Sequence, residues 1–426
     1  MTGIDTAAQR AELQTSRGEV VAEWRRSWPV IVPALLGYMM SSIVTSSVGA
    51  FMGPMQAAFG WNRGQFSAAL SIPALIGVPL MPLVGAVIDR WGPRGVAVVG
   101  GVAAGAATSL FATVTGSLMN WYALWVVYVL ATQLIAPTVW SAATARVFTL
   151  NRGFAMSVVM TGSALAAMLA PIAANALIER YGFRAAYVVL GLGPGALVAV
   201  TSWLAMPRRA APVPSTAKAP AQPPVLTGVT LKQGLRSATF VKIAFVLYVG
   251  QVMVTALTVH LIPLLGGAGL PRDAAVMVAG SYGLAMIVGK LGAGLAADRL
   301  PARFVLATSV ALMAAAFALL AAPRMSIGWA LGAVLLFGFG LGGTALLYPY
   351  IVTRYFGLRS FGRLFGALSC FYGLAFATGP VLAGFLYDQT HGYRVLLLGS
   401  LPFLALAIIL TVSLGRYPAS FTSQAV

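Results

Sequence analysis

A stretch of apolar sequence long enough to cross a lipid bilayer recurs twelve times along this chain, and no other feature restricts its fold as strongly. A helix needs about 20 apolar residues to span the hydrocarbon core. Gly, Ala and Leu dominate the stretches and the alternating pattern of barrel strands is absent, so we predict helices. The predicted spans are residues 28–57, 65–88, 95–115, 119–148, 154–178, 185–206, 239–266, 274–297, 303–322, 326–353, 362–386 and 392–415. The sequence therefore predicts an all-α membrane protein with twelve transmembrane helices.

The distribution of charge predicts how these spans are oriented. Only 8% of the residues are charged, against about a quarter in soluble domains. The net charge of +18 is compatible with a nucleic-acid partner, but 20 of the 27 lysines and arginines fall on segments that share one side of the membrane and six on the other. The side richer in basic residues is normally cytoplasmic. We therefore expect a bacterial-type cytoplasmic (inner) membrane protein with both termini in the cytoplasm and no nucleic-acid partner.

A polar segment with six prolines divides the spans into two groups of six. Such a composition predicts a flexible, extended linker. We predict a cytoplasmic N-terminal segment, a six-helix bundle, a cytoplasmic linker, a second six-helix bundle and a cytoplasmic tail at residues 1–27, 28–206, 207–237, 238–415 and 416–426. Residues 1–27 lack the apolar core of a signal peptide, and both a short surface helix and a disordered tail remain open for them.

The two halves repeat. Arg63 precedes an Asp-Arg pair by 26 residues, and Arg272 precedes the next such pair by the same distance. The motifs ARVF and TRYF are 208 residues apart, and Glu179 and Asp388 are equivalent positions 209 residues apart. Halves of the same sense joined by a cytoplasmic linker are typical of transporters with a central site between the two halves.

The sequence VGAVIDRWGPR at residues 84–94 joins the second and third spans. Its glycines permit a tight turn, and its aspartate can pair with a neighbouring arginine or a helix N-terminus to hold a cytoplasmic gate closed. It resembles the inner-loop motif of the major facilitator superfamily, and the resemblance spans roughly residues 28–415. The residues that match this gating motif are Gly85, Asp89, Arg90, Gly92 and Arg94, with Asp298 and Arg299 in a second copy, AGLAADRLPAR. The resemblance implies two pseudo-symmetric bundles with the major facilitator fold.

Lys290 is the one basic residue inside a predicted span. A charge at that depth costs about 2.5–3.5 kcal/mol unless it is offset. Snorkelling to the interface is one explanation, but Asp298 lies eight residues further on, about 12 Å along a helix, and a lysine stem bridges only part of that length. The nine acidic residues all fall outside the spans, so an anionic substrate is the predicted partner of Lys290.

Three further segments narrow the resemblance. AAFGWNRGQFS, VHLIPLLGGAGL and RYFGLRSFGRLFGALS resemble the monocarboxylate-transporter and oxalate–formate-exchanger branch. In that branch an arginine eight residues before the second-copy aspartate binds the substrate carboxylate, and Lys290 takes its place. The branch's proton-linked aspartate is replaced by Met286, and the exchanger's second cation by Tyr372. The resemblance therefore implies a monoanion site and leaves proton coupling open, with Lys290 as one group that could carry the proton.

The remaining candidates for the substrate site are polar side chains within the spans: Ser46, Tyr348, Ser369 with its neighbour Cys370, and Tyr372. Ordinary helix packing is an equal alternative for Tyr372, Ser369 and Cys370. Some of the serines around Ser46 are expected to bond carbonyls of their own helix, and Tyr348 precedes a proline, where the helix must open its backbone bonding. Gln133, Gln251 and His260 are weaker candidates, and His260 is better placed at the outer end of its span.

Together these features predict a secondary transporter of a small organic monoanion that works by alternating access as a monomer, by symport or antiport. A proton-linked exporter of larger amphipathic solutes is the alternative, and a membrane receptor on the same fold is a third. A single cysteine and two separated histidines give no metal-binding spacing, so we expect no cofactor and no enzymatic activity.

Overall fold

The computed structural model describes residues 4–148, 152–207, 228–357, 359–415 and 417, and its described secondary structure is helical apart from one isolated bridge between Gly228 and Gly357. The helices are α1 Ile4–Phe59, α2 Arg63–Ala68, α3 Val78–Leu110, α4 Leu118–Thr132, α5 Pro137–Val147, α6 Arg152–Ala205, α7 Leu231–Leu235, α8 Ala238–Gly267, α9 Arg272–Arg299, α10 Ala302–Leu320, α11 Ile327–Phe356, α12 Phe361–Thr390 and α13 Arg394–Val412. Short 3₁₀ or π turns are η1 Ala69–Ser71, η2 Pro73–Gly77, η3 Phe111–Thr113 and η4 Gln133–Ile135.

The described helices account for twelve membrane crossings. Ten continuous helical segments are long and apolar enough to cross a membrane. One of them, Phe154–Ala205, has 52 residues and breaks at Gly182, so it supplies two crossings. A further crossing is made by α2, η1, η2 and the part of α3 before Gly92, where prolines, one 3₁₀ turn and one π turn interrupt a single helix. The predicted all-α, twelve-helix fold class is confirmed.

Two glycines make the sharp breaks in these long helices. Gly92 has φ +74° and ψ 157°, and Gly182 has φ +79° and ψ 164°, a region essentially restricted to glycine. Each therefore reverses the chain between two adjacent crossings. Gly92 belongs to the inner-loop motif, so the predicted tight turn is confirmed there.

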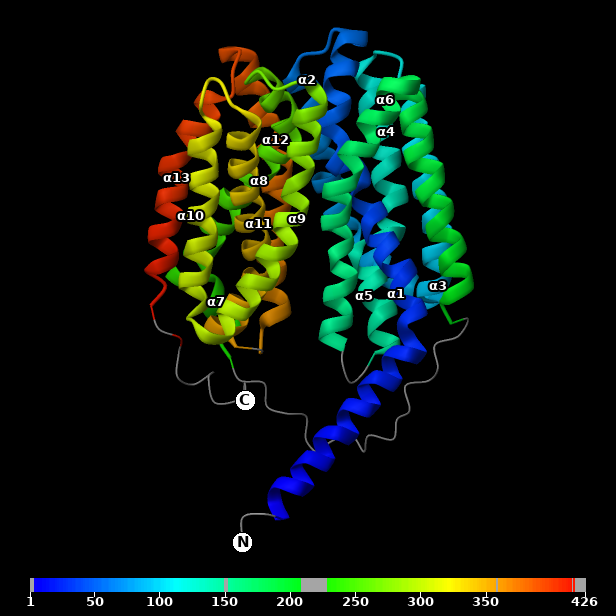
Figure 1. The fold of residues 1–426 in the computed structure, drawn as a ribbon, viewed down its shortest axis with the longest axis vertical. Coiled ribbons are helices and arrows are strands. Elements are labelled where there is room, and N and C mark those ends of the chain that lie inside the picture. Colours follow the sequence, from blue (N-terminus) through cyan, green and yellow to red (C-terminus); the bar gives the residue numbers. More distant parts are fainter. Residues whose placement is uncertain (1–3, 149–151, 208–227, 358, 416, 418–426) are drawn as a thin grey trace.

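The helices form two bundles that lie side by side (Figure 1). The first bundle contains α1 to α6 and the second α8 to α13. We call the end of the molecule that carries α2 the α2 face, and the opposite end, where α5 and α7 lie, the linker face. Figure 1 shows the ribbons of the two bundles close together at the α2 face and diverging toward the linker face. The bundles meet through α6 and α9, α1 and α8, and α2 and α12.

Small residues let the bundles approach each other at mid-depth. A Cβ atom added to Gly283 of α9 would lie 2.5 Å from the carbonyl oxygen of Ala164 on α6, and one added to Gly280 would lie 2.8 Å from that of Met168. Backbones can come this close only where a glycine removes the side chain. The backbones of α6 and α9 are therefore in direct contact between the bundles.

Two segments outside the spans are partly helical. The N-terminal segment continues α1 without a break from Ile4 and projects beyond the linker face (Figure 1), so a helix and not a disordered tail precedes the first span. The five residues of α7 lie inside the predicted linker, where Thr230 caps their N-terminus with a capping box. Residues 208–227 of that linker lie outside the described residues.

Candidate functional site

A first contact cluster joins the bundles at the α2 face, where Asp388 of α12 meets the start of α2. The Asp388 carboxylate accepts hydrogen bonds from the backbone N–H groups of Arg63 at 3.1 Å and Gly64 at 2.8 Å. These N–H groups have no partner within α2, because the first turn of any helix leaves its donors unbonded. The carboxylate also lies at the positive end of the helix dipole. Asp388 thus caps a helix that belongs to the other bundle.

The guanidinium group of Arg63 extends the same cluster. It lies 3.5 Å from the centre of the Tyr387 ring, donates a hydrogen bond to the Tyr393 hydroxyl, and Tyr393 in turn contacts His260. His260 is fully buried and was predicted at the outer end of its span, which is where α8 places it. Burial raises the pKa of the Tyr393 phenol, so this group stays protonated and can donate.

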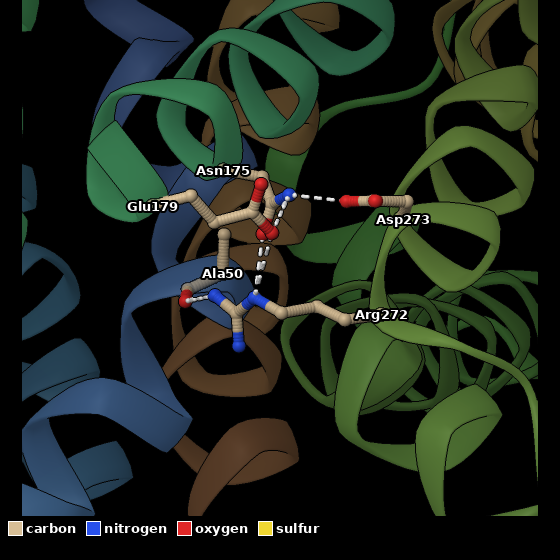
Figure 2. Close-up of polar contacts among 5 residues, drawn as sticks. All are labelled: Ala50, Asn175, Glu179, Arg272 and Asp273. Carbon is tan, nitrogen blue, oxygen red and sulfur yellow. Dashed lines mark hydrogen bonds and ion pairs between the residues drawn. The ribbon is translucent and has the colours of Figure 1, made fainter.

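A second contact cluster joins Arg272, at the start of α9, to Asn175 of α6 (Figure 2). Its guanidinium donates to the Asn175 side-chain oxygen at 2.6 Å and to the Ala50 carbonyl at 2.9 Å. Glu179 lies further away, 3.9 Å from the Arg272 Nε atom. Asn175 donates to both Glu179 and Asp273, at 2.8 and 3.0 Å. The amide of Asn175 is therefore the centre of the cluster.

The two clusters are related by the sequence repeat. Arg63 and Arg272 are 209 residues apart, and so are Glu179 and Asp388. Each arginine position contacts the acidic position of the opposite half, as a pseudo-two-fold axis between the bundles requires. The contacts differ in kind, because Asp388 binds backbone N–H groups whereas Glu179 faces a side chain. The repeated spacing was visible in the sequence and was the signal that could have paired these residues.

Lys290 lies deeper, on the side of α9 that faces the first bundle. It follows Gly283 by seven residues, almost two full turns, so it projects from the face that packs on α6. The antiparallel course of the two helices places the turn containing Ser157 and Met160 of α6 opposite it, and Met160 is 44% exposed. Lys290 is itself partly buried, and among the described side chains no carboxylate contacts its ammonium group.

One tyrosine of the second bundle, Tyr372, has a tyrosine neighbour in each of the two bundles. Tyr372 of α12, which is 47% exposed, is an electrostatic neighbour of Tyr38 on α1 and of Tyr348 on α11. The Tyr348 hydroxyl donates to the Val246 carbonyl at 3.3 Å. Tyr38 was missed by the sequence analysis, because an aromatic residue in an apolar run carries no mark of its partner. This arrangement brings together the predicted Tyr348 and Tyr372.

The predicted serines lie apart from one another. Ser46 of α1 lies near Tyr282 of α9, two turns before Lys290, so this pair of residues comes from both bundles. Ser369 and Cys370 are exposed on α12 and bond carbonyls of their own helix, at 2.9 and 3.6 Å. Their contacts are those expected from helix packing.

Two weaker candidates, Gln133 and Gln251, lie in the first and the second bundle, respectively. Gln133 approaches Gly77 inside the first bundle, and Gln251 is buried in α8. The structure therefore brings neither of them to the interface contacts described above.

The inner-loop motif lies at the linker face, where only part of it is described. The Arg94 guanidinium donates to the Trp203 carbonyl and lies 4.8 Å from the centre of its ring, a contact inside the first bundle. Arg90 and Arg299 are exposed. The side chains of the other predicted gating positions lie outside the described part: Gly85, Asp89 and Asp298. The predicted aspartate lock stays a prediction.

Comparison with known protein families identifies the family to which this chain belongs. The sequence profile of the Major Facilitator Superfamily matches residues 34–359, and also 268–423. The chain belongs to the major facilitator superfamily. It is a multi-pass membrane protein of a transporter family, which indicates transport rather than enzymatic activity. The monocarboxylate-transporter branch stays a prediction.

Among curated relatives, "MFS transporter asaE" of Aspergillus flavus is 25% identical over 415 residues, covering 91% of this chain and 88% of that protein. An "MFS-type transporter" of Gibberella moniliformis is 24% identical, with 83% and 84% covered. The "Fujikurins efflux protein" of Gibberella fujikuroi is 24% identical, with 86% and 77% covered.

Solved structures share the fold. A bacterial homologue of the human lysosomal transporter Spinster, in an inward-facing and unoccupied conformation, has a TM-score of 0.66 at 15% identity and covers 93% of this chain and 99% of its own. A point mutant of the nucleoside transporter NupG has a TM-score of 0.65 at 13% identity, with 91% and 98% covered.

Proposed function

We propose that this protein is a secondary transporter that moves a small organic monoanion across a cytoplasmic membrane by alternating access, with Lys290 pairing with the substrate carboxylate. The observation that carries the proposal is a cation inside a membrane span, on the face of α9 directed at the other bundle, with no acidic partner among the described side chains. Polar groups within a transmembrane bundle mark the paths of substrates and ions.

The energetics favour an anion as the missing partner. An unpaired ammonium group at this depth costs about 2.5–3.5 kcal/mol. A charge-assisted hydrogen bond contributes about 1.5–3 kcal/mol, so a bound carboxylate offsets most of that cost. One cation neutralises one carboxylate, which favours a monoanion over a dianion. The hydroxyls of Tyr38 and Tyr372 offer further contacts to the rest of the molecule.

The conformation agrees with one end of an alternating-access cycle. Polar contacts between the bundles gather at the α2 face, at Arg63 with Asp388 and at Arg272 with Asn175. The ribbons diverge toward the linker face (Figure 1). Basic residues concentrate in segments on the linker face, so we place this face and both termini in the cytoplasm. The described conformation then corresponds to a carrier whose bundles are in contact at the outer face of the membrane.

Export of larger amphipathic acids is a second candidate. The relative from Gibberella fujikuroi is named an efflux protein, and two side chains of this chain, the aromatic Tyr372 and the thioether Met160, are exposed, the latter on the turn of α6 opposite Lys290. Such side chains suit an apolar substrate body attached to a carboxylate. Both candidates use the Lys290 charge, and they differ in the size of the solute and the direction of transport.

The test is transport by purified protein in liposomes, with a panel of radiolabelled monocarboxylates of increasing apolar size. Lys290→Met is compared with Lys290→Arg and with a control, Val288→Met, whose side chain lies on another face of α9 and is 48% exposed. Loss of a charge-assisted bond predicts an affinity about 10- to 150-fold weaker in Lys290→Met, with partial retention in Lys290→Arg. Wild-type transport by Lys290→Met would sink the assignment.

A further inference from the structure

His260 is a buried histidine held on both ring nitrogens where the two bundles meet. Its Nδ1 atom lies 2.8 Å from the Tyr393 hydroxyl, and its Nε2 atom lies 3.1 Å from the Pro380 carbonyl oxygen. Nε2 also lies 3.2 Å from the hydroxyl of Ser67, which belongs to the other bundle. The ring is completely shielded from solvent. One imidazole therefore links α8, α12 and the chain before α13 to the first bundle.

The partners fix the position of the ring hydrogen. A carbonyl oxygen can only accept, so Nε2 carries the hydrogen that bonds Pro380. Nδ1 is then an acceptor, and the Tyr393 hydroxyl donates to it. The Tyr393 oxygen accepts from the Arg63 guanidinium at the same time. Hydrogen bonds thus run in one direction, from Arg63 through Tyr393 and His260 to Pro380, and this direction requires a neutral imidazole.

A second proton on His260 would disrupt this arrangement. It would occupy Nδ1 and leave the Tyr393 hydrogen without its acceptor. It would also add a cation to a cluster that already contains the Arg63 guanidinium. The charged and titratable groups around the His260–Tyr393 pair are Arg63 of α2 and Tyr387 and Asp388 of α12. Asp388 already binds two backbone N–H groups of α2.

We infer that His260 is a proton-binding site that couples the α2 face to the proton, being neutral while the two bundles are in contact there and protonated once they separate. The inference rests on the proposed alternating-access transport and deepens it by naming the proton as a coupling ion. A histidine exposed to water titrates near pH 6.5. We call the population of molecules with the α2 face closed, divided by the population with it open, the closed-to-open ratio. If only the open state binds the proton, this ratio falls about tenfold for each pH unit below pH 6.5. At pH 5 the ratio is therefore about 30-fold lower than at high pH.

The test measures the α2 face directly, with no substrate present. Spin labels are placed at Met119→Cys in the first bundle and Ile327→Cys in the second, both exposed near the α2 face, in a Cys370→Ser background. Pulsed electron–electron distance measurements are made in nanodiscs at pH 8 and pH 5. Wild type is expected to gain a longer-distance population at pH 5, whereas His260→Gln keeps one distribution at both values.

The chain supplies a matched control, since His391 is its only other histidine and is exposed at the same face. His391→Gln should respond to pH like the wild type. If His260→Gln does not fold, His260 can be observed directly, because it is the single histidine of His391→Gln. Nitrogen-15 spectra of that variant report whether His260 is neutral with its hydrogen on Nε2 at pH 8. They also report whether it gains a proton as the longer distance appears. A pH response that survives in His260→Gln, or a wild type that does not respond, would overturn the inference.

The outcome is separable from the transport proposal. Lys290→Met should keep the pH-dependent opening, because Lys290 is not part of the contact cluster. If transport depends on Lys290 but the distance across the α2 face does not change with pH, only the assignment of the proton site is wrong. If the α2 face opens with acid but Lys290→Met transports normally, only the anion site fails.

Discussion

Replacing Asp388 by asparagine should open the α2 face far more than the equivalent change at Glu179. Asp388 accepts two charge-assisted hydrogen bonds from α2, at 3.1 and 2.8 Å. Asparagine keeps one carbonyl oxygen, so one bond survives in neutral form and the other is lost. Bonds to charged groups contribute about 1.5–3 kcal/mol each and neutral ones about 1 kcal/mol, so replacing two charged bonds by one neutral bond costs about 2–5 kcal/mol. The ratio of molecules with the α2 face closed to those with it open should therefore fall at least about 30-fold.

Glu179→Gln is the matched control at the position 209 residues earlier. Its carboxylate is 48% exposed and lies 3.9 Å from the Arg272 Nε atom. Exposed pairs of this kind contribute about 0.2–1 kcal/mol, and glutamine keeps the oxygen that accepts from Asn175, so the ratio should change at most about fivefold. The spin-label pair at positions 119 and 327 measures both variants at pH 8, where His260 is neutral. Equal opening by the two variants, or opening by Glu179→Gln alone, would refute the reasoning.

Two further predictions concern glycines with matched controls on the same helices. Gly283→Ala places a Cβ 2.5 Å from the Ala164 carbonyl oxygen, so it should separate the bundles and lower the thermal unfolding midpoint. The control is Gly292→Ala, whose Cβ meets nothing within 4 Å and which should leave the midpoint unchanged or higher. Gly92→Ala forces a side chain into φ +74° and should destabilise the fold by about 1–3 kcal/mol in reversible unfolding. Gly95→Ala, whose Cβ would make an ordinary 3.9 Å contact, should not; a smaller effect at Gly92 than at Gly95 would contradict the turn argument.

The fold could be predicted from the sequence because a bilayer imposes a strong, local rule. Each crossing needs a long apolar helix, and long apolar stretches such as those of α8 and α13 can be recognised directly in the sequence. The turn at Gly92 could also be predicted, since its backbone conformation is essentially restricted to glycine. The serines of α1 also behave as their chemistry requires: Ser41 and Ser47 bond carbonyls of their own helix.

The candidate site could be predicted only in part, because a repeat specifies which positions are equivalent and not which positions touch. Arg63 and Asp388 were both visible as repeat positions, but their contact depends on how the two bundles pack against each other at the α2 face. Tyr38 was not predictable, since its role depends on the approach of Tyr372 from the other bundle. Lys290 could be singled out from the sequence because an unpaired cation in an apolar span is costly wherever its helix packs, and its role in the site stays a prediction.

The central claim, that Lys290 pairs with an organic monoanion, is tested most directly by ligand-induced stabilisation of purified wild type and Lys290→Met. Both proteins are screened by thermal shift against carboxylates of one and two charges at two pH values. A ligand at 100 times its dissociation constant stabilises the state it binds by about 2.7 kcal/mol. At least one monocarboxylate should raise the unfolding midpoint of the wild type and leave that of Lys290→Met unchanged. Equal stabilisation of both proteins, or a preference for dianions, would contradict it.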